Sequence, residues 1–464
     1  MSNLTFYGAT ETVTGSRFLF EILGQTFLID CGMFQGTKEN RLKNWETFPV
    51  PPKEIARVFL THAHIDHSGY LPRLHRDGFS GPIHSTHATK DLTGILLKDS
   101  AHIQMEDARW ANKKGFTKHD PALPLYRVKD AERVMTKFQP LYYGEDFYLA
   151  DQLRVKFKDA GHILGSSFVE FKTRHGSESR KILFSGDLGR PAVPILRDPV
   201  QVFNVDYLIL ESTYGDRLHE QNSAKEDLAR VINQSVERGG VLLIPAFAVG
   251  RTQTLLFDIR ELEEQGKIPP LPIYVDSPMA LNATDVFERN KSDYDLEAKV
   301  LELNGKHILE PRNVTFARKR KQSKAIDEVK GRAIIISSSG MLVGGRVLHH
   351  LLKRLSNQRN TILFIGYQAE GTRGRAILDG QPTVKIHGQQ VEVGARVEMI
   401  SGYSGHADYN EILAWLMGLN RPPEKTFLVH GEPEAAAALA GKIRSVLGWQ
   451  VVIPKYGDSF KLEM

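Results

Sequence analysis

Hydrophobic and polar residues alternate in short stretches over the first two hundred residues. Apolar runs of four to six residues, separated by turn residues, are typical of strands. We expect strands at 19–23, 26–30, 57–61, 153–158, 168–173, 181–184 and 207–210. Residues 91–114 have helical spacing, and the chain is broken again at Pro121 to Pro124. The pattern therefore predicts a sheet-rich layer with a long helix over it.

The rhythm changes after about residue 211. An apolar run at 241–244 precedes a helical pattern at 251–265, a run at 333–337 precedes a helix at 347–355, and another run follows at 361–365. Strands that alternate with helices indicate βαβ units and a parallel sheet. The last sixty residues return with one more strand at 426–430 and a terminal helix and strand. The change of rhythm and the return predict an inserted domain.

Composition narrows the class of protein. The 464 residues suffice for two or three domains, and 41% hydrophobic with 25% charged residues is typical of a soluble globular chain. The sequence has no apolar run close to the roughly 18 residues of a membrane span and no signal peptide pattern, so we expect a cytoplasmic protein without a membrane partner. The single cysteine, Cys31, excludes an intramolecular disulfide and a thiolate-rich zinc site, and is expected to be a buried small residue.

Net charge is a weaker indication. The value of +5 is compatible with a polyanionic partner. The densest basic run, Arg318 to Lys321 followed by Lys324, is interpreted first as solvated surface and second as a phosphate contact. Charge alone therefore does not decide the partner.

The residues that follow the run at 57–61 are the most informative in the chain. His62, His64, Asp66 and His67 lie within six positions, directly after an expected strand. A loop that leaves a strand end can direct His62 and His64 to one cation and Asp66 and His67 to a second. Three His in six positions are improbable as ordinary surface residues, because only 17 of the 464 residues are His.

Three later strand ends supply further ligands. His162, Asp187 and His430 each follow or end an apolar run. Small residues beside Asp187 let the backbone approach closely, and its carboxylate can bridge two cations. We therefore expect two metal ions that share Asp187. The first would be bound by His62, His64 and His162, and the second by Asp66, His67 and His430.

These residues resemble the metal motifs of the metallo-β-lactamase superfamily. The match includes the His-Ala-His-Ile-Asp-His stretch at residues 62–67 and the three later ligands. The resemblance implies an α/β fold, an αββα sandwich, with two Zn²⁺ per chain; manganese or iron stays open. It also implies that Asp30, which ends the run at 26–30, orients the metal loop without binding metal.

A long insertion indicates the branch of the superfamily. About 190 residues separate Glu211 from the returning segment at Ser401. Residues 210–215 resemble motif A, residues 404–408 motif B and His430 motif C of the β-CASP branch, a group of nucleic-acid-processing nucleases related to the cleavage factor of messenger RNA 3′ ends. The implied division is a metallo-β-lactamase domain, residues 1–210 and 402–464, and an inserted β-CASP domain with a parallel sheet, residues 211–401.

His430 indicates the substrate by the same resemblance. RNA-cutting members carry His at motif C, where DNA-repair members carry an aliphatic residue. We expect a zinc-dependent ribonuclease that hydrolyses phosphodiester bonds of single-stranded RNA and leaves 5′-phosphate and 3′-hydroxyl ends. Endonucleolytic cleavage is favoured over 5′–3′ exonucleolytic cleavage, because the sequence ends 34 residues after His430 without the extra domain of bacterial exonucleases. A homodimer stays open.

Hydrolysis of a phosphodiester also needs a proton for the departing 3′ oxygen. Two zinc ions would lower the pKa of bound water to roughly 7 and stabilise charge on the phosphoryl oxygens, but they do not supply this proton. The resemblance implies that His406 lies at the metal site with Glu211 as its carboxylate partner, which would keep the imidazole protonated. We expect His406 to be the general acid, with Glu211 and Asp66 as the other catalytic residues.

Three Gly- and Ser-rich loops of the insertion suit a polyanion. Arg251 opens a helix, so its side chain and the preceding amides could bind a phosphate. The loops at 337–341 and 366–375 look like substrate-channel signatures of the family; without that resemblance they would be interpreted as turns. The expected RNA phosphate contacts are Arg251, Ser338, Ser339, Arg373 and Arg375.

Other functions stay open at this point. A catalytically silent RNA-binding scaffold would have lost ligands that are all present here, whereas a DNA nuclease or a small-molecule hydrolase of the superfamily would keep them. Cleavage of labelled single-stranded RNA and DNA distinguishes these cases. Four further His residues lie away from the motifs and are expected at the surface rather than on metal: His84, His87, His349 and His350.

Overall fold

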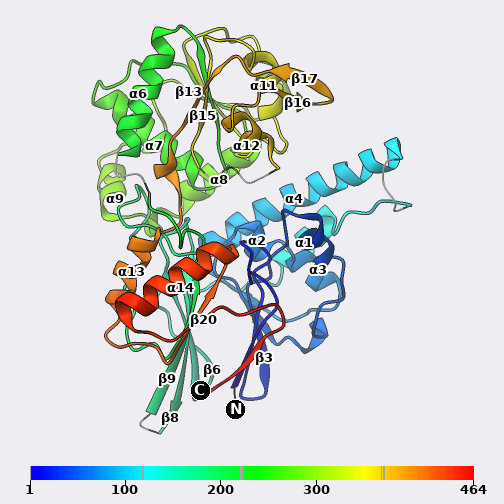
Figure 1. Ribbon diagram of the computed structural model, residues 1–464, viewed down its shortest axis with the longest axis vertical. Coiled ribbons are helices and arrows are strands. Elements are labelled where there is room, and N and C mark those ends of the chain that lie inside the picture. Colours follow the sequence, from blue (N-terminus) through cyan, green and yellow to red (C-terminus); the bar gives the residue numbers. More distant parts are fainter. Residues whose placement is uncertain (1, 116–119, 177, 220–222, 367, 369–370) are drawn as a thin grey trace. The chain divides into compact units, whose positions relative to one another are not determined.

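The computed structural model describes residues 2–115, 120–176, 178–219, 223–366, 368 and 371–464. The chain divides into two compact units, which are described separately. The first comprises Met1–Leu218 and His406–Met464, and the second comprises His219–Gly405. The first unit is thus built from two stretches that are distant in the sequence (Figure 1).

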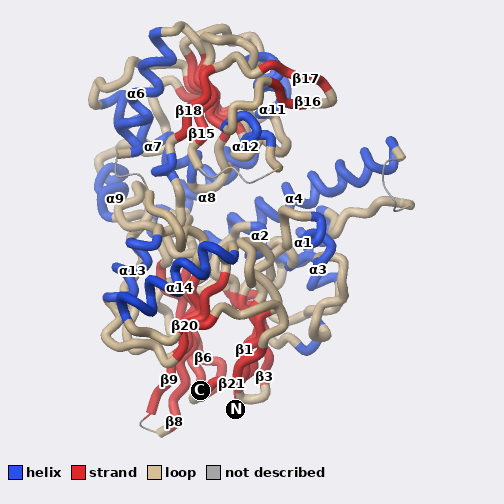
Figure 2. Tube along the Cα trace, in the orientation of Figure 1, coloured by secondary structure: helices blue, strands red, loops and turns tan. Residues whose placement is uncertain are grey.

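Two sheets form the centre of the first unit (Figure 2). The first sheet has the strand order β21–β1–β2–β3–β4–β5, and the second has the order β20–β19–β10–β9–β8–β7–β6. The first sheet consists of β1 (Ser2–Phe6), β2 (Phe18–Ile22), β3 (Gln25–Ile29), β4 (Arg57–Phe59), β5 (Ile83–His84) and β21 (Ser459–Leu462). The second consists of β6 (Phe147–Ala150), β7 (Leu153–Asp159), β8 (Ser167–His175), β9 (Glu178–Phe184), β10 (Tyr207–Glu211), β19 (Lys425–Val429) and β20 (Val451–Val452).

Aromatic side chains fill the space between these sheets. Phe20 and Phe59 of the first sheet contact Phe171 of the second, with ring centroids 5.2 and 5.1 Å apart. The outer face of the first sheet packs on α3 (Leu71–Arg76), α4 (His87–Lys114) and α5 (Val128–Met135). The outer face of the second packs on α13 (Tyr409–Met417) and α14 (Pro433–Leu447). This order of layers confirms the αββα sandwich; α1 (Lys38–Lys43) and α2 (Ile65–Ser68) are short additions.

The second unit is built on a parallel sheet. Its strand order is β13–β12–β14–β11–β15–β18, and all neighbouring strands are parallel. These strands are β11 (Val241–Pro245), β12 (Ile273–Val275), β13 (Val314–Phe316), β14 (Ala333–Ser337), β15 (Thr361–Phe364) and β18 (Arg396–Met399). Between β15 and β18 in the sequence, β16 (Thr383–Ile386) and β17 (Gln389–Glu392) form a separate antiparallel hairpin. β11 and β14 are buried over their whole length, as expected for parallel strands covered on both faces.

Helices pack on both faces of this parallel sheet. One apolar cluster joins it to helices α6 and α7, and another joins it to α11 and α12. The helices of the unit are α6 (Ala224–Glu237), α7 (Arg251–Glu264), α8 (Pro278–Arg289), α9 (Leu296–Leu303), α10 (Arg320–Ile326), α11 (Val347–Arg354) and α12 (Arg373–Leu378). The predicted parallel α/β architecture is therefore confirmed. Among the described residues, no helix combines the length and the apolar composition that a membrane span requires.

Local signals explain where the predictions of elements succeeded. The long helix α4 begins at His87, four residues before the predicted start, because the Thr86 side chain caps it by accepting a hydrogen bond from the Thr89 amide. It ends at Gly115, whose φ of 64° is left-handed. We did not predict β12, β13 and β18 from the sequence. These strands are only three or four residues long, which is too short for an alternating pattern to be recognised.

Candidate metal centre and active site

The predicted metal ligands lie beyond the carboxyl ends of strands. His62 to His67 follow β4, His162 follows β7, Asp187 follows β9 and His430 follows β19. β9, β10 and β19 are parallel to one another, and β7 has the direction of β9 because both are antiparallel to β8. The loops after these strands consequently open at the same edge of the second sheet, which explains how ligands distant in the sequence meet.

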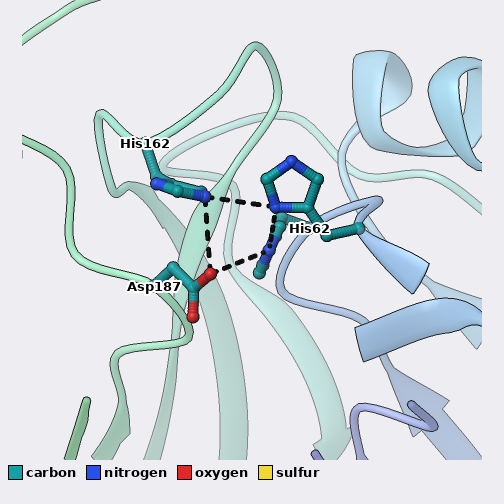
Figure 3. Close-up of side chains that lie close together, drawn as sticks. His62, His162 and Asp187 are labelled. Atoms are coloured by element: carbon teal, nitrogen blue, oxygen red, sulfur yellow. Dashed lines mark hydrogen bonds and ion pairs between the residues drawn. The ribbon is translucent and has the colours of Figure 1, made fainter. Parts of the chain in front are cut away.

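The first ligand cluster consists of His62, His64, His162 and Asp187. One ligand atom from each lies within 4.8 Å of the others. The Asp187 Oδ2 atom is 3.3 Å from His62 Nε2 and 3.4 Å from His162 Nε2, and His64 Nδ1 is 3.1 and 3.2 Å from the same two nitrogens. Figure 3 shows the rings of His62 and His162 and the Asp187 carboxylate pointing toward one another.

The second ligand cluster consists of Asp66, His67 and His430. Their ligand atoms also lie within 4.8 Å of one another. His430 Nε2 is 3.2 Å from His67 Nε2 and 3.3 Å from Asp66 Oδ2. The other Asp187 oxygen, Oδ1, is 3.2 Å from His67 Nε2. Asp187 thus directs one oxygen to each cluster, which is the arrangement of a bridging carboxylate.

The donor atoms suit bound cations. Burial lowers the pKa of His62 to about 3 and the pKa of His64 to about 4, so both rings are neutral and offer a lone pair. Burial alone would raise the pKa of Asp187, but His430 and the other surrounding rings hold it well below its usual range. Asp187 Oδ1 is buried, and His67 Nε2 at 3.2 Å and His430 Nδ1 at 3.5 Å lie next to it. A buried charged oxygen is costly unless a cation pairs with it, so the residues present fit metal ions.

Asp30, which the resemblance implies orients the metal loop, lies next to the ligands. Its carboxylate accepts hydrogen bonds from the Thr61 amide at 2.8 Å and the Thr61 hydroxyl at 2.9 Å. Asp30 Oδ2 is also 2.7 Å from His67 Nδ1. Burial lowers the pKa of His67, but the carboxylates of Asp187 and Asp30 outweigh burial and raise it well above its usual range. Asp30 therefore holds both ends of the loop that carries His62 to His67.

His406 and Glu211 form a buried pair beside the first cluster. His406 Nδ1 is 3.1 Å from both oxygens of Glu211 and 3.9 Å from Asp187 Oδ2. Glu211 also accepts a hydrogen bond from the Leu188 amide at 2.6 Å. Burial lowers the pKa of His406, but Glu211 and then Asp187 outweigh burial and raise it to about 9. The pair therefore presents a protonated imidazole at the metal ligands.

Comparison with known proteins identifies this arrangement. A model of the metallo-beta-lactamase superfamily matches residues 15–143, a model of the Beta-Casp domain matches residues 252–377, and one described as a Zn-dependent metallo-hydrolase RNA specificity domain matches residues 390–454. Ribonuclease TTHA0252 of Thermus thermophilus is 37% identical over 97% of this chain and 98% of its own length. The chain belongs to the β-CASP branch of the metallo-β-lactamase superfamily.

Other relatives also match over nearly the whole of this chain. Transcription termination factor FttA of Pyrococcus abyssi is 32% identical over 99% of this chain and 71% of its own. FttA of Methanocaldococcus jannaschii is 29% identical over 99% of this chain and 72% of its own length. A crystal structure of a protein of unknown function from Enterococcus faecalis has a TM-score of 0.56 at 14% identity, over 99% of this chain and 100% of that one, and shows the fold alone. As a β-CASP family member with two His and Asp clusters, the chain is a metal-dependent hydrolase.

The second unit, His219–Gly405, contains the residues predicted to contact phosphates. Two of them lie at the carboxyl edge of its parallel sheet. Arg251, at the start of α7, lies over the Phe247 ring at 4.7 Å from its centroid. A Cβ added at Gly366 would lie 2.0 Å from Arg251 Nη1, so the guanidinium packs directly against this glycine. Ser338 follows β14, and its hydroxyl is 2.8 Å from that of Ser277. Arg251, Gly366 and Ser338 therefore lie at the ends of strands β11, β15 and β14.

The other three predicted contacts have structural partners in this unit. The Ser339 hydroxyl accepts the Val343 amide at 3.0 Å. Arg373 donates from Nε to the Lys385 carbonyl at 2.7 Å and from Nη1 to the Leu342 carbonyl. Arg375 forms an ion pair with Asp379 at 2.9 Å. Tyr367, Ala369 and Glu370 of the same predicted loop lie outside the described residues.

The surface assignment of two His residues was wrong. His84 and His350 are each only 1% exposed. His84 Nε2 is 3.0 Å from Arg57 Nη1, and His350 Nε2 is 2.8 Å from Asp276 Oδ2. Both rings are buried because a partner distant in the sequence satisfies their nitrogens, which no local pattern reveals. The sequence correctly predicted Cys31 as buried and Arg318 to Lys321 as exposed.

Sequence reasoning also missed two residues that touch the ligands. The Thr213 hydroxyl is 3.1 Å from His430 Nδ1, and the Ser16 hydroxyl is 3.3 Å from His67 Nε2. Thr213 lies two positions after Glu211 in motif A, so its position in that motif was an available signal. Ser16 lies in a glycine-containing loop before β2, and nothing in the sequence around it distinguishes it from other serines.

Proposed function

We propose that this chain is a two-zinc ribonuclease that cuts single-stranded RNA internally and leaves 5′-phosphate and 3′-hydroxyl ends. The observation that carries the proposal is the joint position of the two ligand clusters and the His406–Glu211 pair around Asp187. His62, His64 and His162 would hold one zinc, and Asp66, His67 and His430 the other, with Asp187 between them. Asp30 and Thr213 would fix the rings of His67 and His430 through their Nδ1 atoms.

Each protein group has a separate task in this proposal. Two bound zinc ions would supply positive charge for the phosphoryl oxygens and lower the pKa of water to roughly 7. Glu211 binds His406 Nδ1, so the proton for the departing 3′ oxygen would leave from Nε2, the nitrogen on the other side of the ring. Asp66 is both a proposed ligand and a catalytic residue, since its carboxylate faces His430 beside the reacting centre.

Several findings support RNA as the substrate. A family model named for RNA specificity matches residues 390–454, and a relative that is 37% identical is named a ribonuclease. His430 occupies the motif C position that is aliphatic in DNA-repair members of the resembling branch. We propose that the inserted domain, residues 211–401, holds the RNA through Arg251, Ser338, Ser339, Arg373 and Arg375.

The test uses single-stranded RNA and DNA of one sequence, each labelled at the 5′ end in one sample and at the 3′ end in another. The purified chain with zinc should cut the RNA at internal positions, and the products should be ligatable through a 5′-phosphate. Asp187→Ala, purified in parallel, controls for a contaminating nuclease. Faster cleavage of the DNA would contradict the substrate, mononucleotides released from one end would contradict the internal mode, and tight RNA binding without cleavage would identify a scaffold.

A further inference from the structure

A basic surface lies on the outer face of the second sheet, away from the metal ligands. In β7, Leu153, Val155 and Phe157 point into the core between the sheets. The alternate residues Arg154, Lys156 and Lys158 point outward and are 23%, 22% and 20% exposed. We call these three residues, with Lys172 of β8 and Lys181 of β9, the basic face.

Strand register aligns three cations of the basic face in one row. Arg154 lies directly opposite Lys172, and Lys172 lies directly opposite Lys181. Neighbouring strands are about 4.8 Å apart, so these three cations span only about 10 Å across the sheet. Like charges placed directly opposite one another destabilise a sheet. A bound anion would reduce the repulsion within this row.

Carboxylates on the same face do not neutralise it. Glu170 of β8 is buried among the cations, 2.7 Å from Lys158 Nζ, 3.6 Å from Arg154 and 3.7 Å from Lys181. Asp146 is 3.0 Å from Arg154 and 2.9 Å from Lys156. Five cations against these two carboxylates leave a positive surplus. Burial lowers the pKa of Lys181, and the cations around it lower it further, although Glu170 opposes them.

Exposed aromatic residues flank the row at both ends. Tyr148 of β6 is paired with Arg154, so it shares the outward face, and it is 63% exposed. At the other end Lys181 donates to the Phe203 carbonyl at 3.0 Å, and the Phe203 side chain is 50% exposed. The three cations of the row therefore have an exposed aromatic residue next to each end. Single-stranded nucleic acid is bound by this combination, since cations contact the backbone and bases stack on aromatic rings.

Neighbouring elements leave this part of the sheet accessible. Helices α13 and α14 pack on Phe168, Leu183 and Leu208, which are nearer to the metal-site edge. Figure 1 shows β8 and β9 extending beyond these two helices. The side chain of Arg154 is 23% exposed and that of Lys181 is 16% exposed. The basic face also continues toward the active site, because Lys158 lies only four residues before His162.

We propose that the basic face is a second binding surface for single-stranded RNA, which holds the strand outside the active site while Tyr148 and Phe203 stack on its bases. The proposal rests on the proposed ribonuclease function for the identity of the polyanion. Phosphates would offset the like-charge row, and release of their counterions would drive binding. The surface should favour long RNA, since a short substrate that fills the active site does not reach it.

The test compares two triple variants that lose the same charge. Arg154→Gln, Lys172→Gln and Lys181→Gln remove the row, whereas Lys53→Gln, Lys455→Gln and Lys461→Gln remove three exposed cations elsewhere on the unit. Binding is measured with RNA of about 30 nucleotides and of about 8 nucleotides, since binding sites on single strands span roughly 4–16 nucleotides. Cleavage of the short RNA is measured on the same samples, so the ribonuclease function is tested separately.

The row variant should bind the long RNA on the order of 10- to 100-fold more weakly at 0.1 M salt, with a salt slope flatter by about 2 for three lost contacts. It should cut the short RNA at the rate of the unchanged chain. The control triple should bind both RNAs as the unchanged chain does. Equal affinity of the two triple variants for the long RNA would overturn the proposal, even where the short RNA is cut.

A second variant separates RNA from an acidic protein as the occupant. Tyr148→Ala should weaken binding of the long RNA by about fivefold or more, the usual effect of one lost stacking residue, and should not alter binding of poly-glutamate. If the row variant loses poly-glutamate and RNA equally and Tyr148→Ala affects neither, the surface binds acidic chains in general and the assignment to RNA is wrong.

Discussion

Glu211→Gln isolates the proposed proton donor from the proposed metal ligands. Glu211 contacts His406 Nδ1 with both oxygens at 3.1 Å and is not among the seven residues proposed as metal ligands. The substitution keeps the size of the side chain, and its carbonyl oxygen can keep the acceptor for the Leu188 amide. It removes the charge and replaces the other oxygen that faces His406 with an NH2 group. Zinc ions bound to Asp187 would offset the negative charge of that carboxylate, which also raises the pKa of His406. We therefore expect the charge of Glu211 to set the pKa of His406 during catalysis.

The size of the effect follows from the contact distance. Two unit charges about 4 Å apart interact by about 4 kcal/mol at an effective dielectric constant of 20, which equals about three pKa units. The pKa of His406 is raised to about 9, so loss of the Glu211 charge should return it to 6.5 or below. At pH 7.5 fewer than about one ring in ten would then be protonated, and cleavage should slow on the order of 10-fold.

Single-turnover cleavage measured from pH 5.5 to 9 checks this expectation. A general acid works in its protonated form, so activity is lost as pH rises through the pKa of His406. Glu211→Gln should shift this loss to lower pH by about two to three units and recover most of the rate near pH 6. His406→Ala should lose on the order of 10²- to 10⁴-fold at every pH while it keeps both zinc ions. Glu328→Gln, at a side chain that is 76% exposed, is the matched loss of charge and should change nothing.

Three results would refute the reasoning. If Glu211→Gln slows cleavage equally at all pH values, Glu211 does not act through the proton of His406. If His406→Ala loses zinc, His406 is a ligand and the assignment of His67 or His430 must change. A substrate whose departing 3′ oxygen is replaced by sulfur needs no proton, so it should restore part of the rate of His406→Ala; no recovery would mean that His406 positions the phosphate instead.

Three further predictions concern metal, pH and salt. Asp187→Ala should remove activity and most of the zinc, as measured by metal analysis after dialysis, because its two oxygens face both clusters; retention of two zinc ions would contradict the bridging role. Burial raises the pKa of Asp258 from 3.8 to about 6, so the folded state loses stability as pH rises through this range. Asp258→Asn should therefore unfold at the same temperature as the unchanged chain near pH 4, and its free energy of unfolding at pH 8 should be higher by about 1 to 3 kcal/mol. If the variant and the unchanged chain were equally stable at both pH values, the raised pKa would be contradicted. Arg373→Gln with Arg375→Gln should flatten the salt dependence of RNA binding by about 1.4 without loss of zinc, and an unchanged slope would exclude both as phosphate contacts.

The predictions from sequence were accurate where the signal is local. The strands that precede His62, His162 and Asp187 could be predicted because apolar runs and turn residues repeat over a few positions. The same holds for helix α4 and the parallel sheet of the second unit. Short elements such as β12 and β13 were missed, because three residues carry no measurable periodicity.

The sequence by itself determined which residue types are available at strand ends, and therefore the kind of centre that the chain can form. Only the tertiary structure decided which atoms meet. That Asp187 divides its oxygens between two clusters, that Glu211 holds His406 Nδ1 and that His350 is buried on Asp276 all depend on contacts between distant segments. The alternation in β7 is visible in the sequence, but the row formed with Lys172 and Lys181 exists only through strand register. Register and burial are set by the packing of whole sheets, and no short window of sequence contains that information.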